Sequence, residues 1–218
     1  MKSLKLIEAC FALFCKKSET LIVQNNIAKQ IFKDGRDKVF QKRNLKGFKY
    51  LIGAINLQLS SDINHWACVC VSLVNKQIFY VDPLGTDDIE LEEILSNWIN
   101  FLANRQDLPK SDWSIGHFEC DKQKDGFNCG IIIIMVIQNI LNNNYRLSFN
   151  EKSLADFRII LINLIKTTKY NRKFCNKCGD NIDKSALILK CIICSRCFHR
   201  VCCNVIDNID DFQCSICG

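Results

Sequence analysis

The chain has 218 residues, of which 48% are hydrophobic and 24% are charged. This balance excludes a disordered protein and predicts one medium domain with a smaller one beside it. The formal net charge is +6, but the basic residues are spread along the chain without a long basic block, so nucleic-acid binding is not implied. Nine of the 15 cysteines fall within residues 175–218. An odd count with C-x-x-C pairs and no secretory signal predicts metal ligands in the reducing interior of a cell, nucleus or cytoplasm, rather than disulfides.

The N-terminal stretch from Leu4 to Cys15 is apolar, but Lys5 and Glu8 interrupt it. This pattern predicts an amphipathic helix instead of a targeting segment. The apolar side chains that share one face are Ile7, Cys10, Phe11 and Phe14. The only other long apolar run, residues 130–137, is too short to span a bilayer, so we expect no membrane partner. Residues up to position 48 are basic and irregular.

Three segments rich in Val, Ile and Leu predict the strands of a mixed or antiparallel sheet. They cover residues 50–59, 66–74 and 77–81, and the short break between the last two is typical of a hairpin. A shorter strand is predicted at residues 113–118. Asp87 and Glu90 resemble a helix-capping box, followed by apolar residues at helical spacing as far as Leu102. This helix is expected to pack on the sheet.

The apolar segment from Cys129 to Leu141 has the length of a buried helix. Ser153 and Asp156 resemble a second capping box, which would open a helix with one apolar face. The residues of that face are Phe157, Ile160, Leu161, Leu164 and Ile165. The polar and basic stretch that follows predicts a linker at residues 169–174, between a domain of residues 1–168 and a small domain of residues 175–218.

Four residues in the larger domain could carry out thiol proteolysis: His65, Asp82, Gln123 and Cys129. Such chemistry needs a thiolate, a base, an acceptor that orients the base, and donors for the developing oxyanion. A hairpin that turns between residues 73 and 76 would bring Asp82 back to within a stagger of about two residues from His65. At a helix start, Cys129 would have its pKa lowered by the helix dipole and further by His65 as imidazolium.

The order and spacing of these residues, from Tyr50 to Leu141, resemble the ubiquitin-like-protein proteases of the Ulp/SENP family, with adenovirus proteinase as a distant relative. The resemblance implies an α+β, papain-like or adenain-like cysteine protease core in which helices flank a central mixed sheet. It also implies roles for the four residues and for Trp66. His65 would be the general base, Asp82 its orienting acid, Cys129 the nucleophile and Gln123 an oxyanion-hole donor, while Trp66 would cover a narrow tunnel for a Gly-Gly tail.

The chain departs from the family pattern at several positions. Asn128 stands where an Asp usually precedes the nucleophile, Asp125 stands where an Asn usually follows the Gln, and Pro83 stands where Ser is common. None of these changes removes a member of the triad. The family also supplies a second tryptophan from its N-terminal part to hold the substrate tail, and no Trp precedes Trp66 in this chain.

The last 44 residues carry eight metal-ligand residues in four pairs. A two-residue gap lets one turn present both members of a pair to a zinc ion, which prefers four such ligands in a tetrahedron. The eight residues are Cys175, Cys178, Cys191, Cys194, His199, Cys202, Cys214 and Cys217. A domain this short has little apolar core, so we expect two structural zinc ions to supply much of its folding free energy.

These four pairs resemble the PHD finger, a cross-brace fold with two interleaved zinc sites. The resemblance implies that Cys175, Cys178, His199 and Cys202 hold one ion, and that Cys191, Cys194, Cys214 and Cys217 hold the other. It also implies that Phe212 packs between the two sites. A RING finger needs a further C-x-x-C step after the histidine, but positions 204 and 205 are Asn and Val, which favours the PHD type.

The ligand of the finger stays open at this level. PHD fingers that read methylated lysine usually place a tryptophan two residues before the histidine, and this position is Cys197. Asp207, Asp210 and Asp211 could still attract a basic peptide such as a histone tail. Because the set of eight ligands is complete without them, Cys197 and Cys203 are predicted not to bind metal.

The leading hypothesis is a cysteine protease, similar to a deSUMOylase, that cleaves a ubiquitin-like (SUMO-like) precursor or isopeptide conjugate with a Gly-Gly-type tail. The PHD finger would serve for targeting. One alternative is a processing peptidase of a viral or mobile-element polyprotein. The other is a catalytically inactive zinc-finger adaptor that binds chromatin. The absence of an N-terminal Trp would favour this second alternative.

Overall fold

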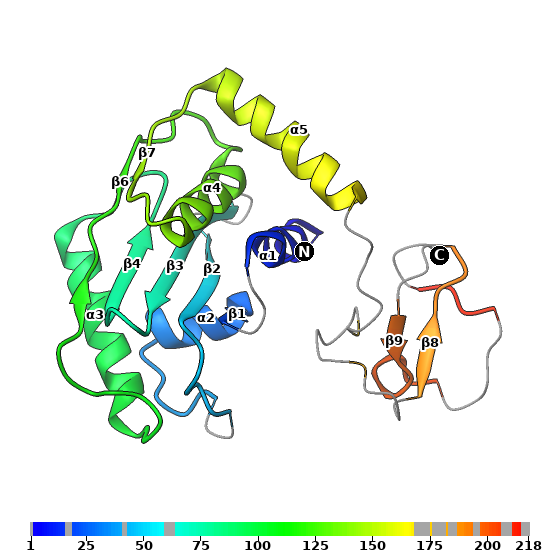
Figure 1. Ribbon diagram of the computed structural model, residues 1–218, viewed down its shortest axis with the longest axis horizontal. Coiled ribbons are helices and arrows are strands. Elements are labelled where there is room, and N and C mark those ends of the chain that lie inside the picture. The colour runs from blue at the N-terminus through cyan, green and yellow to red at the C-terminus, as the bar shows by residue number, and fades with distance from the viewer. Residues whose placement is uncertain are drawn as a thin grey trace. The chain divides into compact units, whose positions relative to one another are not determined.

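A computed structural model describes residues 2–15, 19–40, 43–58, 64–167, 175, 182, 187–193, 197–205 and 211–214. The chain forms two compact units, residues 1–165 and residues 166–218 (Figure 1). Within the described ranges, none of the helices combines the length and the apolar character that a bilayer crossing requires.

A five-stranded mixed sheet forms the centre of the larger unit (Figure 1). Its strands, in spatial order, are β1 (Thr20–Val23), β2 (Tyr50–Gln58), β3 (Asn64–Ser72), β4 (Gln77–Val81) and β5 (Ser114–Ile115). The outer pairs β1–β2 and β4–β5 are parallel, whereas β2, β3 and β4 run antiparallel to their neighbours. The predicted mixed sheet is confirmed, although the strand expected at residues 113–118 is only two residues long.

Helices cover both faces of this sheet (Figure 1). The helices of the larger unit are α1 (Lys2–Phe14), α2 (Asn25–Phe32), α3 (Asp88–Ala103), α4 (Cys129–Leu141) and α5 (Glu151–Thr167). Apolar residues of α1, α4 and α5 pack in one layer, and those of α2 and α3 pack in the other. The predicted helices at residues 4–15 and 129–141 are confirmed, as is the cap of α3, where Asp87 accepts a hydrogen bond from the Glu90 amide.

The strand β3 shows how one segment serves both layers. Trp66, Cys68 and Cys70 point toward the layer that contains α4. Ala67 and Val69 point toward the layer that contains α2 and α3, because successive side chains of a strand alternate between faces. A strand that is buried on both faces needs apolar residues at consecutive positions, which explains the uninterrupted run in the sequence.

Several short elements of the larger unit were not predicted, and one helix was predicted to begin too late. The strand β1 and the helix α2 lie in the stretch described above as irregular. The helix α5 begins three residues earlier than Ser153 and Asp156 suggest, because Asn150 and Ser153 form the reciprocal capping pair: each side chain accepts from the other's backbone N–H.

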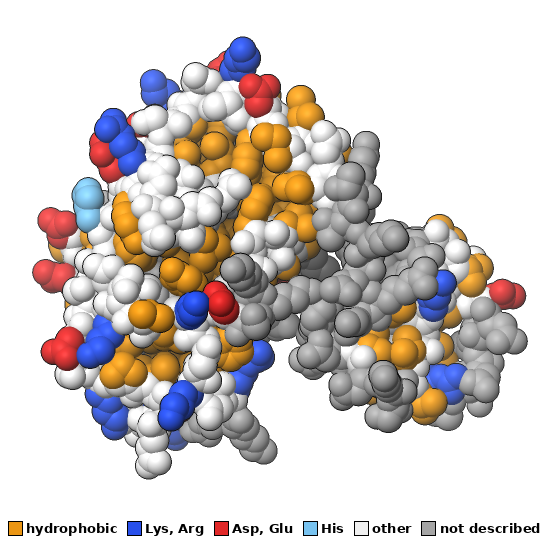
Figure 2. Space-filling model, in the orientation of Figure 1, with side chains coloured by type: hydrophobic (Ala, Val, Ile, Leu, Met, Phe, Trp, Pro, Cys, Tyr) orange, Lys and Arg blue, Asp and Glu red, His pale blue; other side chains and the backbone are white. Residues whose placement is uncertain are grey.

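The apolar face of α5 is also rotated from the predicted one. Leu154 is buried together with the predicted Phe157 and Leu161, but Ile160 is 50% exposed. Ile159 and Ile162 of the same helix are exposed as well. Apolar side chains accordingly reach the surface of the larger unit in the region of α5 (Figure 2). The four residues of β6 (Glu119–Cys120) and β7 (Arg146–Leu147) form a separate short parallel pair.

The smaller unit has a two-stranded antiparallel sheet, β8 (Ile188–Lys190) and β9 (Cys197–His199), followed by a short 3-10 helix, η1 (Val201–Cys203). Its described core consists mainly of cysteines, with Leu189 and Phe198 as the large buried apolar side chains. The ring of Phe198 meets that of Phe212 edge-on, with centroids 5.5 Å apart. The predicted linker at residues 169–174 lies outside the described residues.

Replacing Gly116 by alanine should destabilise the larger unit. A Cβ atom at this position, just after β5, would lie 2.3 Å from the ring of Phe79 in β4. The ring or the strand must then shift, which costs about 1–3 kcal/mol. Denaturant titration should show this decrease in the free energy of unfolding. Gly126→Ala is the matched control, because no described atom lies within 4 Å of the Cβ it would add; equal losses in both variants would contradict the close approach.

Candidate active site

The predicted base and its orienting acid meet at one end of the central sheet. The pairing of β3 with β4 places Cys68 opposite Val81, so the next residue, Asp82, comes level with position 67, two residues from His65. The two residues thus lie diagonally on one face of the hairpin. His65 Nε2 is 2.5 Å from Asp82 Oδ1, and the His65 side chain is 4% exposed. The predicted stagger of about two residues is confirmed.

A tight turn after β4 fixes the carboxylate of Asp82. The backbone N–H of Gly85 donates to the Asp82 carbonyl at 2.9 Å, which closes a four-residue turn. The N–H of Leu84 donates to Asp82 Oδ1 at 2.7 Å, and the Thr86 hydroxyl accepts from the Asp82 N–H at 3.1 Å. Asp at the first position, Pro83 at the second and Gly85 at the fourth form a common turn sequence. Pro83, one of the departures from the family pattern, therefore suits this turn.

Cys129 is the first residue of α4 and is 4% exposed. Its thiol lies near enough to the His65 ring to affect the pKa of that ring. With Nε2 of the ring bonded to Asp82, the remaining ring nitrogen, Nδ1, is the one available to the thiol. Burial by itself lowers the pKa of His65, but the hydrogen bond that the ring donates to Asp82 and the interaction with Cys129 outweigh it and raise the pKa from 6.5 to about 9. His65 is therefore an imidazolium at neutral pH.

Gln123 is buried close to this group, in the loop that precedes α4. Its backbone N–H donates to the Pro83 carbonyl at 2.7 Å, which joins this loop to the turn that holds Asp82. Its side-chain nitrogen donates to the Asp125 carbonyl at 2.5 Å and lies 3.2 Å from Asp125 Oδ1. Among the described residues, its buried Oε1 has no hydrogen-bond partner. The amide is thus held in place through its nitrogen.

Trp66, the predicted cover of a substrate tunnel, follows His65 on the opposite face of β3. It is 7% exposed and belongs to the apolar layer that contains α1 and α4. The aromatic residues Phe11 and Phe14 of α1 pack in or against the same layer. By contrast, Phe127 is 75% exposed, two positions before Cys129. Sequence reasoning did not single out this exposed aromatic residue.

The other five thiols of the larger unit differ from Cys129 in their surroundings. Burial raises the pKa of Cys10 to about 11, and those of Cys15 and Cys120 to about 12. Burial also raises the pKa values of Cys68 and Cys70, which lie inside β3. These thiols therefore stay protonated at neutral pH.

The smaller unit brings three of the predicted metal ligands together. The ligand atoms of Cys175, His199 and Cys202 all lie within 4.8 Å of one another. The His199 N–H donates to Cys175 Sγ at 3.2 Å, and the Cys214 N–H donates to Cys191 Sγ at 3.4 Å. Two sulfurs and an imidazole are ligands that zinc prefers. The predicted ligands Cys178, Cys194 and Cys217 lie outside the described residues.

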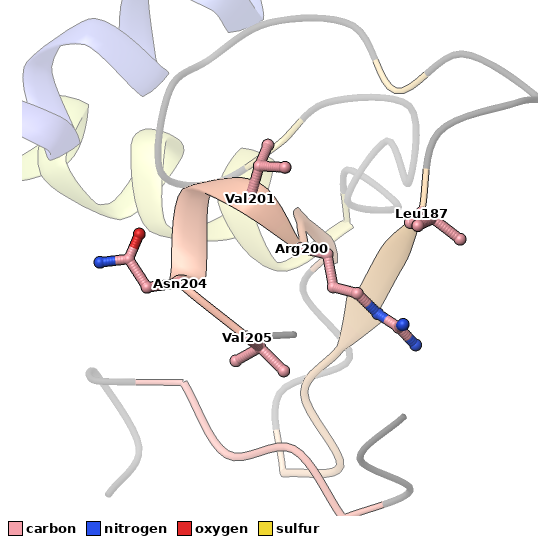
Figure 3. Close-up of a pocket in the computed structure, with 5 residues that line it drawn as sticks. All are labelled: Leu187, Arg200, Val201, Asn204 and Val205. Carbon is pink, nitrogen blue, oxygen red and sulfur yellow. The ribbon is translucent and has the colours of Figure 1, made fainter. Parts of the chain in front are cut away.

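A hollow of about 380 Å³ lies on the smaller unit. Leu187, Arg200, Val201, Asn204 and Val205 line it, and Figure 3 shows them around the start of β8 and both ends of η1. No predicted metal ligand is among these lining residues, so the hollow is distinct from the metal group.

The comparisons with known proteins assign the larger unit. A family profile described as "Ulp1 protease family, C-terminal catalytic domain" matches residues 2–172. The chain belongs to the Ulp1 protease family. It is therefore a cysteine protease of that family. No curated protein sequence gives a significant match.

Solved structures of this family share the fold. The yeast Ulp1 protease domain, solved in complex with Smt3, the yeast ortholog of SUMO, has a TM-score of 0.59 and 21% identity over 73% of this chain and 74% of its own. The SUMO protease Ulp1 with its catalytic cysteine oxidised to a sulfonic acid has a TM-score of 0.58 and 20% identity over 75% of each chain. The Chaetomium thermophilum Ulp1-like SUMO protease catalytic domain has a TM-score of 0.51 and 13% identity over 75% of this chain and 69% of its own.

Removing the carboxylate of Asp82 should lower the pKa of His65. In Asp82→Asn the hydrogen bond to a charged acceptor is lost, so burial acts with less opposition and the pKa should fall from about 9 by at least about one unit. NMR titration of histidine-labelled protein measures this directly, since the chain has three histidines and His65→Gln assigns the resonance. Asp112→Asn, which removes a carboxylate paired with Lys76 at the opposite end of β4, should leave the titration unchanged. An unaltered His65 pKa in Asp82→Asn would disprove the coupling.

Proposed function

We propose that Cys129, His65 and Asp82 form the catalytic triad of this Ulp1-family protease. The Cys129 thiolate attacks the carbonyl carbon of the scissile bond, and the His65 imidazolium gives its proton to the departing amine, leaving a thioester. His65, now neutral, takes one proton from the water that attacks the thioester. The product leaves as a carboxylic acid, which loses the second water proton to solvent, and the Cys129 thiolate is restored beside the His65 imidazolium. The observation that carries this proposal is the contact between His65 and Asp82, together with the influence of the nearby Cys129 thiol on the His65 ring.

The supporting roles belong to Asp82 and Gln123. Asp82 holds the imidazole ring through Nε2 and favours its charged form, which leaves Nδ1 directed to the reaction. We assign the oxyanion hole to the side-chain amide of Gln123 and the backbone N–H of Cys129. The 3.2 Å contact of Gln123 with Asp125 Oδ1 is the weaker of its two, and it is the one that an oxyanion would replace.

The substrate that we propose is a SUMO-like or related ubiquitin-like protein, cleaved after a Gly-Gly-type tail as a precursor or as an isopeptide conjugate. Family membership over residues 2–172 supports this class, and so does the similarity of the fold to a protease domain solved in complex with a SUMO ortholog. Trp66, next to the base in the chain, is assigned as the cover over the tail. Glycines suit such a position because they add no side chain where two surfaces approach closely.

A panel of ubiquitin-like proteins that carry a C-terminal electrophile tests both the activity and the substrate class. The wild-type chain should form a covalent adduct with at least one SUMO-like member, seen as a mass shift at Cys129. Cys129→Ser should form none, and His65→Ala should label far more slowly because the thiol loses its charged partner. The matched control Cys120→Ser, which replaces a thiol with a raised pKa, should label like the wild type. Adducts that persist in Cys129→Ser would move the nucleophile elsewhere.

We further propose that residues 175–218 form a PHD-type finger with two structural zinc ions, joined by the linker 169–174 to a protease domain of residues 1–168. Cys175, Cys178, His199 and Cys202 would hold one ion. The proximity of Cys175, His199 and Cys202 supports this set. The second ion would be held by Cys191, Cys194, Cys214 and Cys217, and the hydrogen bond from the Cys214 amide to Cys191 Sγ supports their closeness. The described core of the unit has few large apolar side chains, so the metal would stabilise the fold.

The finger is assigned a targeting role, with a basic peptide such as a histone tail as its ligand class. Asp211 is exposed and could attract lysine or arginine side chains, whereas Asp207 and Asp210 lie outside the described residues. Cys197, at the position where a methyl-lysine reader carries Trp, is 6% exposed. A buried thiol offers no aromatic face to a methylated ammonium group, so the proposed ligand is an unmodified basic segment.

Metal analysis of the full chain should give two zinc ions per molecule. His199→Ala should lose the first ion, and Cys214→Ser the second, each with partial loss of the other because the two sites share loops. The matched controls Cys197→Ser and Cys203→Ser should keep both ions. Loss of zinc in Cys197→Ser would mean that the ligand register is wrong and would favour another type of finger.

A further inference from the structure

Asp125, in the loop before Cys129, accepts several hydrogen bonds from neighbouring residues of that loop. Oδ1 of Asp125 accepts from the backbone N–H groups of Phe127 at 2.9 Å and Asn128 at 2.8 Å. Oδ2 accepts from the side-chain amide of Asn128 at 2.6 Å. The side-chain nitrogen of Gln123 lies 3.2 Å from Oδ1. One carboxylate thus connects the assigned oxyanion donor to the residue that precedes Cys129.

Asn128, the residue before Cys129, forms hydrogen bonds through both its side chain and its backbone. Its side-chain oxygen accepts a hydrogen bond from the guanidinium of Arg158 in α5, and the residue is 5% exposed. Its carbonyl accepts from the N–H groups of Ile131 and Ile132, both at 3.0 Å, which opens α4 at Cys129. Asn is among the best helix-capping residues, but this side chain makes no capping bond. It bridges Asp125 and Arg158 instead.

The bridge has a fixed direction, from donor to acceptor. Arg158 only donates, the Asn128 amide accepts on its oxygen and donates from its nitrogen, and the Asp125 carboxylate only accepts. Burial raises the pKa of Asp125, but hydrogen bonds from the Asn128 side chain, the Phe127 and Asn128 amides and Gln123 outweigh it and keep the pKa below its usual value. The carboxylate is therefore charged at neutral pH and stays a pure acceptor.

We propose that Asp125 is a positioning residue, which sets the place of Cys129 through Asn128 and keeps the Gln123 amide beside it. The proposal rests on the assignment of Cys129 as nucleophile. Arg158 anchors the far end of the bridge, so that α5 and the loop before α4 hold the residue before the nucleophile between them. A nucleophile displaced by about 1 Å can lose about a hundredfold in rate, so a loose bridge would lower kcat without removing any reacting group.

The direction of the bridge makes a sharp test possible. In Asp125→Asn, the new side-chain amide could turn its NH2 group toward the NH2 group of Asn128, so that two donors face each other. The variant also loses the negative charge that balances Arg158. In Asn128→Asp, two carboxylates would face each other. The exchange of both, Asp125→Asn with Asn128→Asp, restores one donor and one acceptor at the contact and places a carboxylate against Arg158.

Turnover of a ubiquitin-like substrate by the full chain should show this pattern. Each single variant should lose about tenfold to a hundredfold in kcat with KM within about threefold, and the double exchange should return kcat to within about threefold of the wild type. The rate of Cys129 alkylation by iodoacetamide, followed by mass spectrometry of its peptide, should fall and recover in parallel. The matched control Asp112→Asn, whose carboxylate pairs with Lys76 at the far end of β4, should change neither value.

Wild-type kcat in both single variants would overturn the proposal, and so would a double exchange no more active than the weaker single variant. If a single variant melts below the assay temperature, Asn128→Ala takes its place. Asp125→Asn added to Asn128→Ala should then cost little more, because the partner is already gone, whereas a second full loss would overturn the bridge. Absence of wild-type turnover, or its survival in Cys129→Ser, would instead refute the catalytic assignment, and the alkylation rates would still test the positioning.

Discussion

The register between β3 and β4 is the constraint on which the candidate active site depends. Because side chains alternate along a strand, a slip of one residue would send Asp82 to the opposite face of the sheet from His65. The register is fixed by burial on both sides: Cys68, Cys70 and Val81 face the layer of α1 and α4, while Val71 and Tyr80 face the layer of α2 and α3. A slipped hairpin would have to rebuild two apolar layers at once. The packing of the sheet thus protects the geometry of two polar residues at its end.

The charge state of His65 results from two opposed effects of that packing. Removal from water disfavours the imidazolium, whereas Asp82 and Cys129 stabilise it. The partners prevail because they lie in direct contact, and a hydrogen bond to an ionised acceptor is stronger where water is scarce. The same layers that bury the ring therefore strengthen the hydrogen bond that keeps it charged.

Much of this arrangement could be predicted from the sequence, because it depends on local periodicity and on spacing along one hairpin. The helix at Cys129, the strand at Gln77–Val81 and the stagger between His65 and Asp82 all follow from such signals. The sequence did not show which residue caps α5, since Asn150 and Ser153 are both good capping residues. The C-x-x-C pairs identify candidate metal ligands, but spacing alone does not show how distant pairs combine.

The hydrogen bonds around Asp125 could not be predicted from the spacing of residues in the sequence. Asp125 and Asn128 each departed from the family pattern when read alone, yet in the structure they are the two ends of one hydrogen bond. Relative to the family pattern, an acid and an amide have exchanged places. Arg158 carries no signal at all, since it lies 30 residues further along the chain and reaches Asn128 only through the packing of α5.

The uneven chemistry of the thiols has a consequence for handling the protein in the laboratory. Burial suppresses ionisation of the other five cysteines in the larger unit, whereas Cys129 stands at a helix start beside a charged imidazole. Alkylating and oxidising reagents act on thiolates. With Cys129 as the proposed nucleophile, such reagents should modify it in preference to the other cysteines of the larger unit, so a fluorophore or crosslinker could be attached there without first removing them.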